Sequence, residues 1–172
     1  MDRYDGFREF VRARQQSLAR SAYLLTGDAH LAEDLLQSVL AKVAGHWPKL
    51  RLNGNPEAYT RKALVNEYLS WRRRIRRDLP SADLPDHGRS HDDATLNRIV
   101  LGQALRRLTA RQRAVIVLRF YEDRTERETA ELLGCSVGTV KSQTHHALGR
   151  LRALAPELAG LFSDAAPQEV TR

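Results

Sequence analysis

The sequence predicts an all-α protein of two small helical domains joined by a flexible acidic linker. Apolar residues recur at three- and four-residue steps through most of the chain, which is the spacing of helices with one buried face. No stretch alternates apolar and polar residues as a half-buried strand would. Residues 78–94 interrupt the helical pattern with prolines, a glycine and five aspartates. We therefore expect domains over 1–77 and 95–155, and a tail over 156–172.

The first domain is expected to contain three helices, over residues 5–25, 29–46 and 56–77. Gly27 should terminate the first helix, and Asp28 should cap the second. Pro48 should end the second helix, because a residue that precedes proline avoids the helical conformation. A loop should follow at Leu50–Asn55, since its asparagines and glycine tolerate unusual backbone angles. Pro56 is well suited to the first turn of the third helix.

The third helix carries the strongest positive charge in the chain. Its basic side chains are Arg61, Lys62, Arg72, Arg73, Arg74, Arg76 and Arg77, and from Ala58 onward they are opposed only by Glu67. Tyr59, Tyr68 and Trp71 are interleaved with them. Aromatic faces among cations suit a single-stranded nucleic acid, which needs stacking surfaces beside groups that neutralise phosphates. The alternative is a structural role, and we expect one or two of these aromatic residues in the core.

The second domain is expected to begin with a helix from Thr95 and a second helix, Ala110–Tyr121, capped by Thr109. A helix-turn-helix should follow over Thr125–Arg152. In it Gly134 can stop the first helix and Ser136 can cap the second. The buried stripe of that second helix should consist of Val137, Val140, Thr144, Ala147, Leu148 and Leu151.

The opposite face of this last helix predicts DNA binding. It carries hydrogen-bond donors and no acidic residue, and the donors are Lys141, Ser142, His145, His146 and Arg150. Such side chains can reach base edges or phosphates when a helix enters the major groove. Helix pairs with a glycine turn also occur in many proteins that do not bind DNA, so this pattern alone leaves both interpretations open.

Charge and cysteine content narrow the function further. The net charge of +7 favours a polyanionic partner such as nucleic acid. The only cysteine, Cys135, excludes an internal disulfide and a multi-cysteine zinc site, and we expect it to be a packed side chain rather than a redox centre. No signal peptide is evident, and no apolar run approaches the roughly 18 residues of a membrane span. We expect a cytoplasmic protein with no membrane contact.

No catalytic set is evident in the sequence. His145 and His146 are adjacent, so a helix directs them about 100° apart, which suits a shared metal ion poorly. The acidic pairs Glu33-Asp34 and Asp92-Asp93 are also adjacent and lack the fixed geometry of acid–base catalysis. Phosphate-binding and dinucleotide-binding glycine motifs are missing. We expect no enzyme activity, no metal, no cofactor and no small-molecule substrate.

Three stretches together resemble one family. They are AEDLLQ at 32–37, PEAY at 56–59 with LVN at 64–66 and the arginines that follow, and LTARQRAVIVLRFYEDRTERETAELLGCSVGTVKSQTHHALGRLR at 108–152. In this order they resemble the bacterial sigma-70 family, namely its extracytoplasmic-function group of RNA polymerase sigma factors, and within it the short SigE-like members of actinobacteria. The resemblance covers about residues 5–152.

The resemblance implies a function and a set of sites. The first domain would bind the β′ clamp of core RNA polymerase and the melted promoter −10 element, and the second would bind the β flap and the −35 duplex. The implied polymerase contacts are Asp34 and Gln37. The implied −10 contacts are Asn53, Gly54, Asn55, Asn66, Arg72, Arg73 and Arg74. The implied −35 contacts are Lys141, Ser142, His145 and His146 at the bases, with Thr139, Gln143 and Arg150 nearer the phosphates. An anti-sigma factor is a further partner that the resemblance allows.

Four residues depart from the family pattern. Gln143 and His146 stand where arginine is common, Tyr59 stands where tryptophan is usual, and Arg61 lies in a region that is often apolar.

The helix-turn-helix also leaves an alternative function open. The protein would then be a dimeric helix-turn-helix regulator that binds duplex DNA without polymerase.

Overall fold

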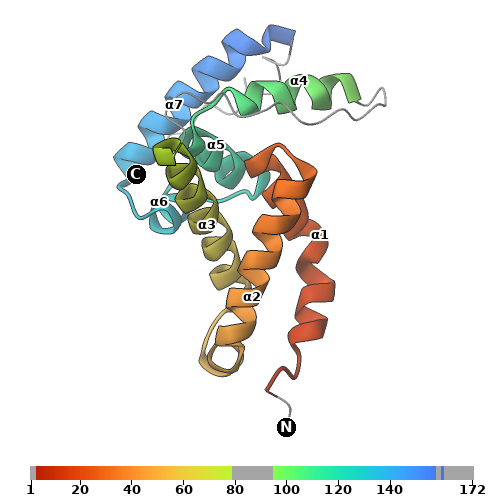
Figure 1. Ribbon diagram of the computed structural model, residues 1–172. Helices are drawn as coiled ribbons and strands as arrows, with labels where there is room; N and C mark the ends of the chain where they lie inside the picture. The colour runs from red at the N-terminus through yellow and green to blue at the C-terminus, as the bar shows by residue number, and fades with distance from the viewer. Residues whose placement is uncertain (1–2, 79–94, 158–159, 161–172) are drawn as a thin grey trace.

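The computed structural model describes residues 3–78, 95–157 and 160, and contains no strand within them. This confirms the all-α prediction (Figure 1). The helices are α1 (Phe7–Thr26), α2 (Ala29–Asn53), α3 (Pro56–Asp78), α4 (Thr95–Arg106), α5 (Ala110–Ile116), α6 (Glu126–Leu133) and α7 (Val137–Leu154), with a π-helical turn, η1 (Val117–Tyr121), between α5 and α6. The predicted linker, apart from Asp78, and most of the predicted tail lie outside the described residues.

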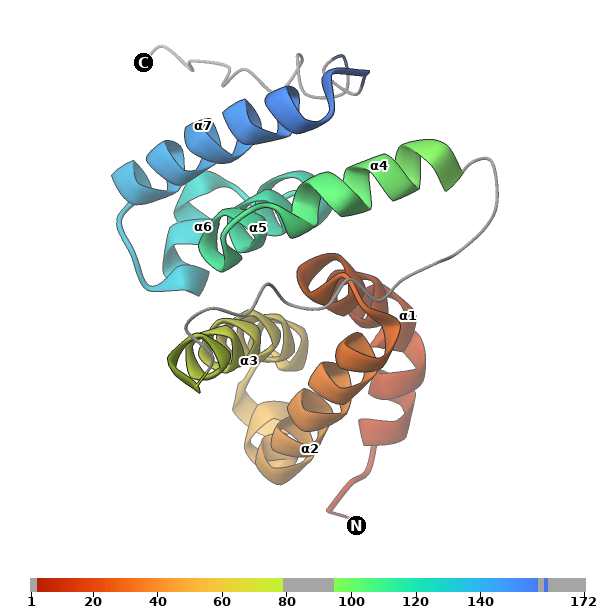
Figure 2. The same cartoon turned by 45° about the horizontal axis from the view of Figure 1, so that its top comes forward.

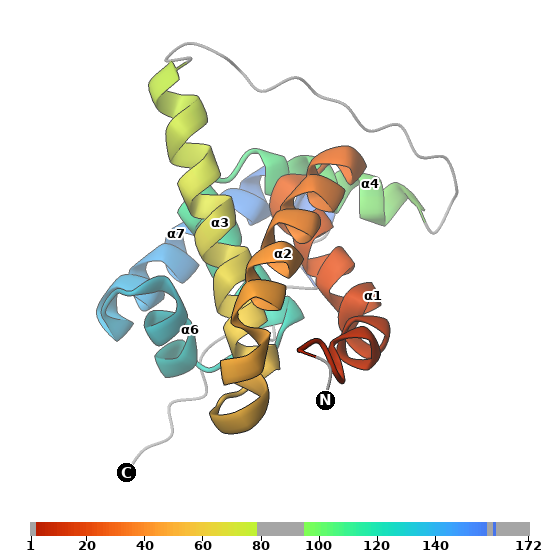
Figure 3. The same cartoon turned by 60° about the horizontal axis from the view of Figure 1, so that its bottom comes forward.

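The first half consists of α1, α2 and α3, and α2 lies between the other two (Figure 3). Gly27 adopts the left-handed conformation at the end of α1, with φ of 72°. Asp28 caps α2, because its side chain accepts a hydrogen bond of 2.9 Å from the Leu31 backbone N–H. Both predictions for this turn are therefore confirmed.

The expected end of the second helix at Pro48 is wrong, because α2 continues to Asn53 with Pro48 inside it. Tertiary packing holds the helix together there. The Trp47 side chain is 4% exposed, its indole Nε1 donates to the Asp5 carbonyl at 2.8 Å, and the rings of Phe7 and Phe10 pack against it. Proline removes only one backbone donor, and these contacts offset that loss.

The second half consists of α4, α5, η1, α6 and α7, and α4 runs beside α7 (Figure 2). Thr109 caps α5 as predicted, in a capping box with Gln112. The single helix expected over Ala110–Tyr121 instead changes to π-helical geometry at Val117. The backbone N–H of Glu122 reaches the Val117 carbonyl at 2.9 Å. The π turn thus places Glu122 directly after the helix and against the first half, with consequences described below.

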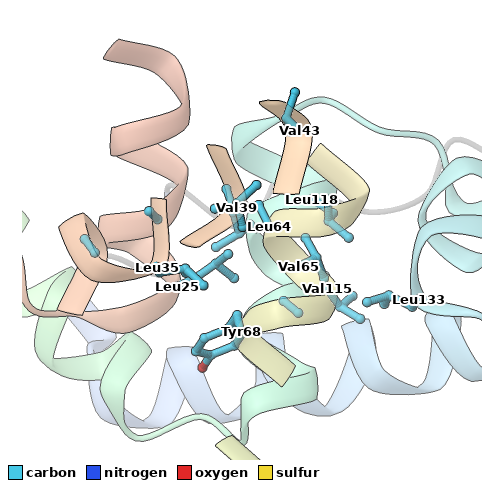
Figure 4. Packing of buried hydrophobic residues seen from close by; sticks show 14 of the residues in the cluster. Leu25, Leu35, Val39, Val43, Leu64, Val65, Tyr68, Val115, Leu118 and Leu133 are labelled. Carbon is cyan, nitrogen blue, oxygen red and sulfur yellow. The ribbon is translucent and has the colours of Figure 1, made fainter. Parts of the chain in front are cut away.

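One hydrophobic cluster joins the two halves (Figure 4). Leu64, Val65 and Tyr68 of α3 meet Val115 of α5 and Leu118 of η1 there. Each fully buried aliphatic side chain contributes about 1.5–3 kcal/mol to stability. A second cluster lies between α4, α5 and α7 and consists of Ala104, Leu105, Leu108, Ile116, Ala147, Leu148, Leu151 and Ala155. The described parts of the two halves therefore pack against each other.

Candidate nucleic-acid interface

The helix-turn-helix is fixed by hydrogen bonds at both sides of its turn. Thr125 and Glu128 form a capping box at the start of α6, and Gly134 ends that helix in the left-handed conformation, with φ of 62°. The Ser136 side chain accepts from the Thr139 backbone N–H at 3.1 Å and caps α7. The predicted stop and cap are confirmed. Cys135, between them, is half-buried and packs against the main cluster, as expected for a structural side chain.

Helix α7 buries one face and exposes the other. Val140, Ala147, Leu148 and Leu151 are buried as predicted, and Thr144 is half-buried. Val137 departs from the prediction, since it lies 38% exposed at the first position of the helix. The predicted donors Lys141, Ser142, His145, His146 and Arg150 are exposed, and Thr139 and Gln143 are half-buried.

An acidic residue borders this face that the sequence analysis missed. Glu126, in the first turn of α6, lies 3.8 Å from the Lys141 ammonium group. Helical periodicity describes the faces of one helix, whereas this carboxylate reaches α7 from the neighbouring helix α6. The rings of His145 and His146 lie 5.7 Å apart. Within the described residues no cluster of three metal-ligating side chains occurs.

The candidate −10 loop is shorter than predicted. Asn53 is the last residue of α2, so only Gly54 and Asn55 connect α2 to α3. Asn55 Oδ1 accepts from the Ala58 backbone N–H at 3.0 Å, which fixes the start of α3. Asn53, Gly54 and Asn55 are nevertheless all exposed. A tight exposed corner replaces the expected six-residue loop, because α2 does not stop at Pro48.

The candidate strand-binding residues of α3 differ in how accessible they are. Asn66, Arg73 and Arg74 are exposed, whereas Arg72 is half-buried. Glu67 forms ion pairs with Arg74, at 3.6 Å, and with Lys42 of α2. Glu67 therefore partly neutralises the basic face of α3.

The interleaved aromatic residues have mainly structural positions. Tyr68 is 1% exposed and belongs to the core, so it offers no stacking surface in this arrangement. Tyr59 and Trp71 are half-buried, and the Tyr59 hydroxyl lies 3.3 Å from His46 Nδ1. The prediction that one or two of these residues are buried is confirmed for Tyr68.

Arg61 does not lie on the basic surface, in contrast to the grouping made from the sequence. Its side chain is 13% exposed and pairs with Glu57 at 3.1 Å and with Glu122 at 2.9 Å. Glu122 comes from the second half of the chain. Arg61, one of the four residues that depart from the family pattern, is therefore an internal ion-pair partner.

Asp34 and Gln37, the candidate polymerase contacts, are both exposed on α2. Gln37 Nε2 donates to Glu33 Oε1 at 3.3 Å. Asp34 borders a groove of about 190 Å³ between α2 and α3, whose other lining residues are Leu31, Leu35, Ser38, Glu67, Trp71 and Arg74. In this groove Asp34 of α2 and Arg74 of α3 line the same depression.

Among the described residues, no helix combines the length and the apolar character required to cross a bilayer.

The sequence of this chain is similar to those of known proteins along most of its length. The family model for sigma-70 region 2 matches residues 10–78, and that for sigma-70 region 4 matches residues 98–151. The RNA polymerase sigma-E factor of Streptomyces coelicolor is 42% identical over 150 residues, which are 85% of this chain and 84% of that protein. The ECF RNA polymerase sigma factor SigL of Mycobacterium tuberculosis is 32% identical over 148 residues, which are 82% and 84% of the two chains.

A solved structure agrees as well. The sigma factor RpoE of Bartonella quintana, crystallised in complex with the anti-sigma factor NepR, superposes with a TM-score of 0.73 at 27% identity. The superposition covers 87% of this chain and 96% of that one. With both family models matched in chain order and relatives above 30% identity along most of the chain, the protein belongs to the sigma-70 family, as an RNA polymerase sigma factor of the extracytoplasmic-function group.

Proposed function

We propose that this sigma factor reads the −35 element with the exposed face of α7 and holds the melted −10 strand along α3 and the Asn53–Asn55 corner. The observation that carries this proposal is the division of α7 into two faces. Val140, Ala147, Leu148 and Leu151 of one face are buried in the core, whereas the donors Lys141, Ser142, His145, His146 and Arg150 of the other face are exposed and can enter a major groove. Lys141 and His145 would meet base edges, and Arg150 would meet phosphates.

The surface of α3 supports the second contact. Asn66, Arg73 and Arg74 follow one another along an exposed face, where they could neutralise the phosphates of one strand. The corner that precedes the first turn of α3 offers the amide groups of Asn53 and Asn55 to an unstacked base, although Asn55 Oδ1 already serves as the cap of α3. That cap would leave its Nδ2 donors available.

We propose further that Asp34 and Gln37 contact the β′ clamp of core polymerase and that the second domain contacts the β flap. The similarity to a sigma factor solved with an anti-sigma factor supports a partner of that class for this chain too. We infer a cytoplasmic protein that catalyses no reaction itself, since polymerase supplies the chemistry.

A variant series on α7 tests the −35 assignment. His145→Ala and His146→Ala should each change the preference among −35 sequences by about 1–3 kcal/mol per lost base contact. His30→Ala is the matched control, because His30 is an exposed histidine on α2, away from α7. Run-off transcription with core polymerase on promoters with single −35 substitutions gives the measurement. Equal preferences in all three variants would show that the histidines do not read DNA.

Dependence on polymerase separates this function from the alternative. A dimeric regulator should shift duplex promoter DNA on its own, whereas the proposed function requires core polymerase for a promoter-specific shift. Tight binding of palindromic duplex DNA by the purified protein, as a dimer and without core polymerase, would contradict our proposal.

A further inference from the structure

The short segment that precedes α1 contacts the last turns of α2. We call its residues Tyr4–Gly6 the N-terminal hook, in which Gly6 takes the left-handed conformation with φ of 78°. The Asp5 carbonyl accepts a hydrogen bond of 2.8 Å from Trp47 Nε1. The Asp5 carboxylate also forms an ion pair of 3.2 Å with Arg51 Nη1. A single residue of the hook therefore contacts two side chains of α2.

These two side chains lie on either side of a weak point in α2. Pro48 has no backbone N–H, so the helical hydrogen bond to the carbonyl of Ala44, four residues earlier, is missing. A proline inside a helix therefore weakens the turn that surrounds it. The hook contacts Trp47 just before the proline and Arg51 just after it. It thus supports the part of α2 that follows the proline.

That part of α2 leads directly into the candidate −10 corner, Asn53–Asn55. The corner is tightly closed, because the Gly54 backbone N–H donates to the Leu50 carbonyl at 3.1 Å. A Cβ on Gly54 would lie 3.0 Å from Leu50 Cα, so the backbones already approach closely there. The direction of the last turn of α2 therefore sets the position of the corner. The hook and the corner lie at the same end of the first half (Figure 1 and Figure 3).

The ion pair of the hook differs from its buried part. Trp47 is 4% exposed and belongs to the core, whereas the side chains of Asp5 and Arg51 are 60% and 28% exposed. An exposed ion pair adds little to the stability of a protein. Substitution of Asp5 can therefore change the direction of the last turn while the core around Trp47 stays packed.

We propose that Asp5 and Arg51 are positioning residues for −10 recognition. Through their ion pair, the hook holds the last turn of α2 in the direction that presents Asn53 and Asn55 to an unstacked base. The selectivity for −10 bases then depends on a segment at the start of the chain. This inference rests on the proposed function in one respect, namely that the corner holds the melted −10 strand.

A charge swap tests the ion pair. Asp5→Arg places two cations together, and Asp5→Arg with Arg51→Asp restores a pair of reversed polarity. Run-off transcription with core polymerase gives the discrimination against single base substitutions in the −10 element and, separately, in the −35 element. Asp5→Arg should lose about threefold of its −10 discrimination, or about 0.7 kcal/mol, which is within the range of an exposed pair. The swap should regain this loss, and −35 discrimination should not change.

Glu131→Arg is the matched control for this substitution. It makes the same change in charge and breaks another exposed ion pair, in which Arg127 Nε lies 3.4 Å from Glu131 Oε1 on α6. Its −10 discrimination should equal that of the unsubstituted protein. A loss in Glu131→Arg as large as that in Asp5→Arg would attribute the effect to net charge and overturn the proposal. Equal losses at −10 and −35 in Asp5→Arg, or no recovery in the swap, would overturn it too.

Asn53→Ala separates this inference from the proposed function. A loss of −10 discrimination in Asn53→Ala but not in Asp5→Arg would overturn the role of the hook and leave the function of the corner intact. Unchanged −10 discrimination in both variants would contradict the assignment of the corner, and the positioning role with it.

Hydrogen exchange gives a measurement without DNA. The Gly54 amide should exchange about threefold faster in Asp5→Arg, because its hydrogen bond to Leu50 closes the corner, and the swap should reverse this change. The Ala155 amide is the internal control, since it donates to the Leu151 carbonyl at 2.9 Å at the end of α7. Unchanged exchange at Gly54 would show that the ion pair does not hold the corner, and would overturn the proposal.

Discussion

Two glycines offer a matched test of the contact between the halves. Gly27 and Gly134 both adopt left-handed backbone at the end of a helix, with φ of 72° and 62°. A Cβ on Gly27 would lie 2.9 Å from Arg106 Cγ and 3.1 Å from Arg106 Cδ, whereas a Cβ on Gly134 would meet nothing within 4 Å. Arg106 belongs to α4, so only Gly27→Ala should disturb the interface.

Gly27→Ala and Gly134→Ala should lower the free energy of unfolding by different amounts, because only Gly27→Ala crowds Arg106. Each alanine should cost about 1–2 kcal/mol, because its side chain disfavours the left-handed conformation. Gly27→Ala should cost about 1–3 kcal/mol more, because a new methyl group in a packed site forces its neighbours to shift. The Arg106 guanidinium also donates to the Gly27 carbonyl at 3.3 Å, so its shift would weaken this hydrogen bond.

A double-mutant cycle measures the difference. Urea unfolding gives the free energy of unfolding for Gly27→Ala, Arg106→Ala and the double variant. In the Arg106→Ala background the extra cost of Gly27→Ala should disappear and leave only the backbone cost, with Gly134→Ala as the reference. Equal losses for Gly27→Ala and Gly134→Ala, or a coupling energy near zero, would refute the crowding argument.

Three further predictions concern α3 and α6. Arg72→Ala with Arg73→Ala should reduce the salt slope of open-complex formation by about 1.5, and an unchanged slope would remove both from the DNA contact. Burial raises the pKa of Tyr68 above its ordinary value of 10.0. The contribution of this group to stability should therefore be fully present below about pH 10 and lost as the pH rises through the raised pKa. The melting temperature of Tyr68→Phe should fall less steeply between neutral and alkaline pH than that of the unsubstituted protein. Thr125→Ala should cost about 1 kcal/mol and lower the melting temperature by about 2–4 °C, whereas Thr125→Ser should retain the cap.

Helix ends whose signals are local were predictable from the sequence. Asp28, Thr109 and Ser136 cap the helices that follow them because their side chains accept from backbone N–H groups three residues on, and that geometry needs no tertiary partner. Gly134 ends α6 for a similarly local reason. The donor face of α7 could be predicted too, because the residues that a helix buries leave the opposite face exposed.

Features that depend on distant partners could not be predicted in this way. Pro48 signals a helix end, yet Trp47 is held by residues of α1 and the preceding segment that lie about forty positions away, so the helix continues. The loop expected at Leu50–Asn55 is shorter than predicted for the same reason, because α2 continues to Asn53. The π-helical geometry of η1 has no simple periodic signal either, since its apolar residues fit an ordinary helix equally well.

Arg61 shows how a long-range contact is concealed within a local pattern. In the sequence it is one of many basic residues on a helix that suits nucleic acid, and nothing nearby distinguishes it from the exposed arginines that follow. Its partner Glu122 lies in another domain after an acidic linker. Removal of one partner from a buried ion pair costs about 3–5 kcal/mol, because the remaining charge stays without compensation.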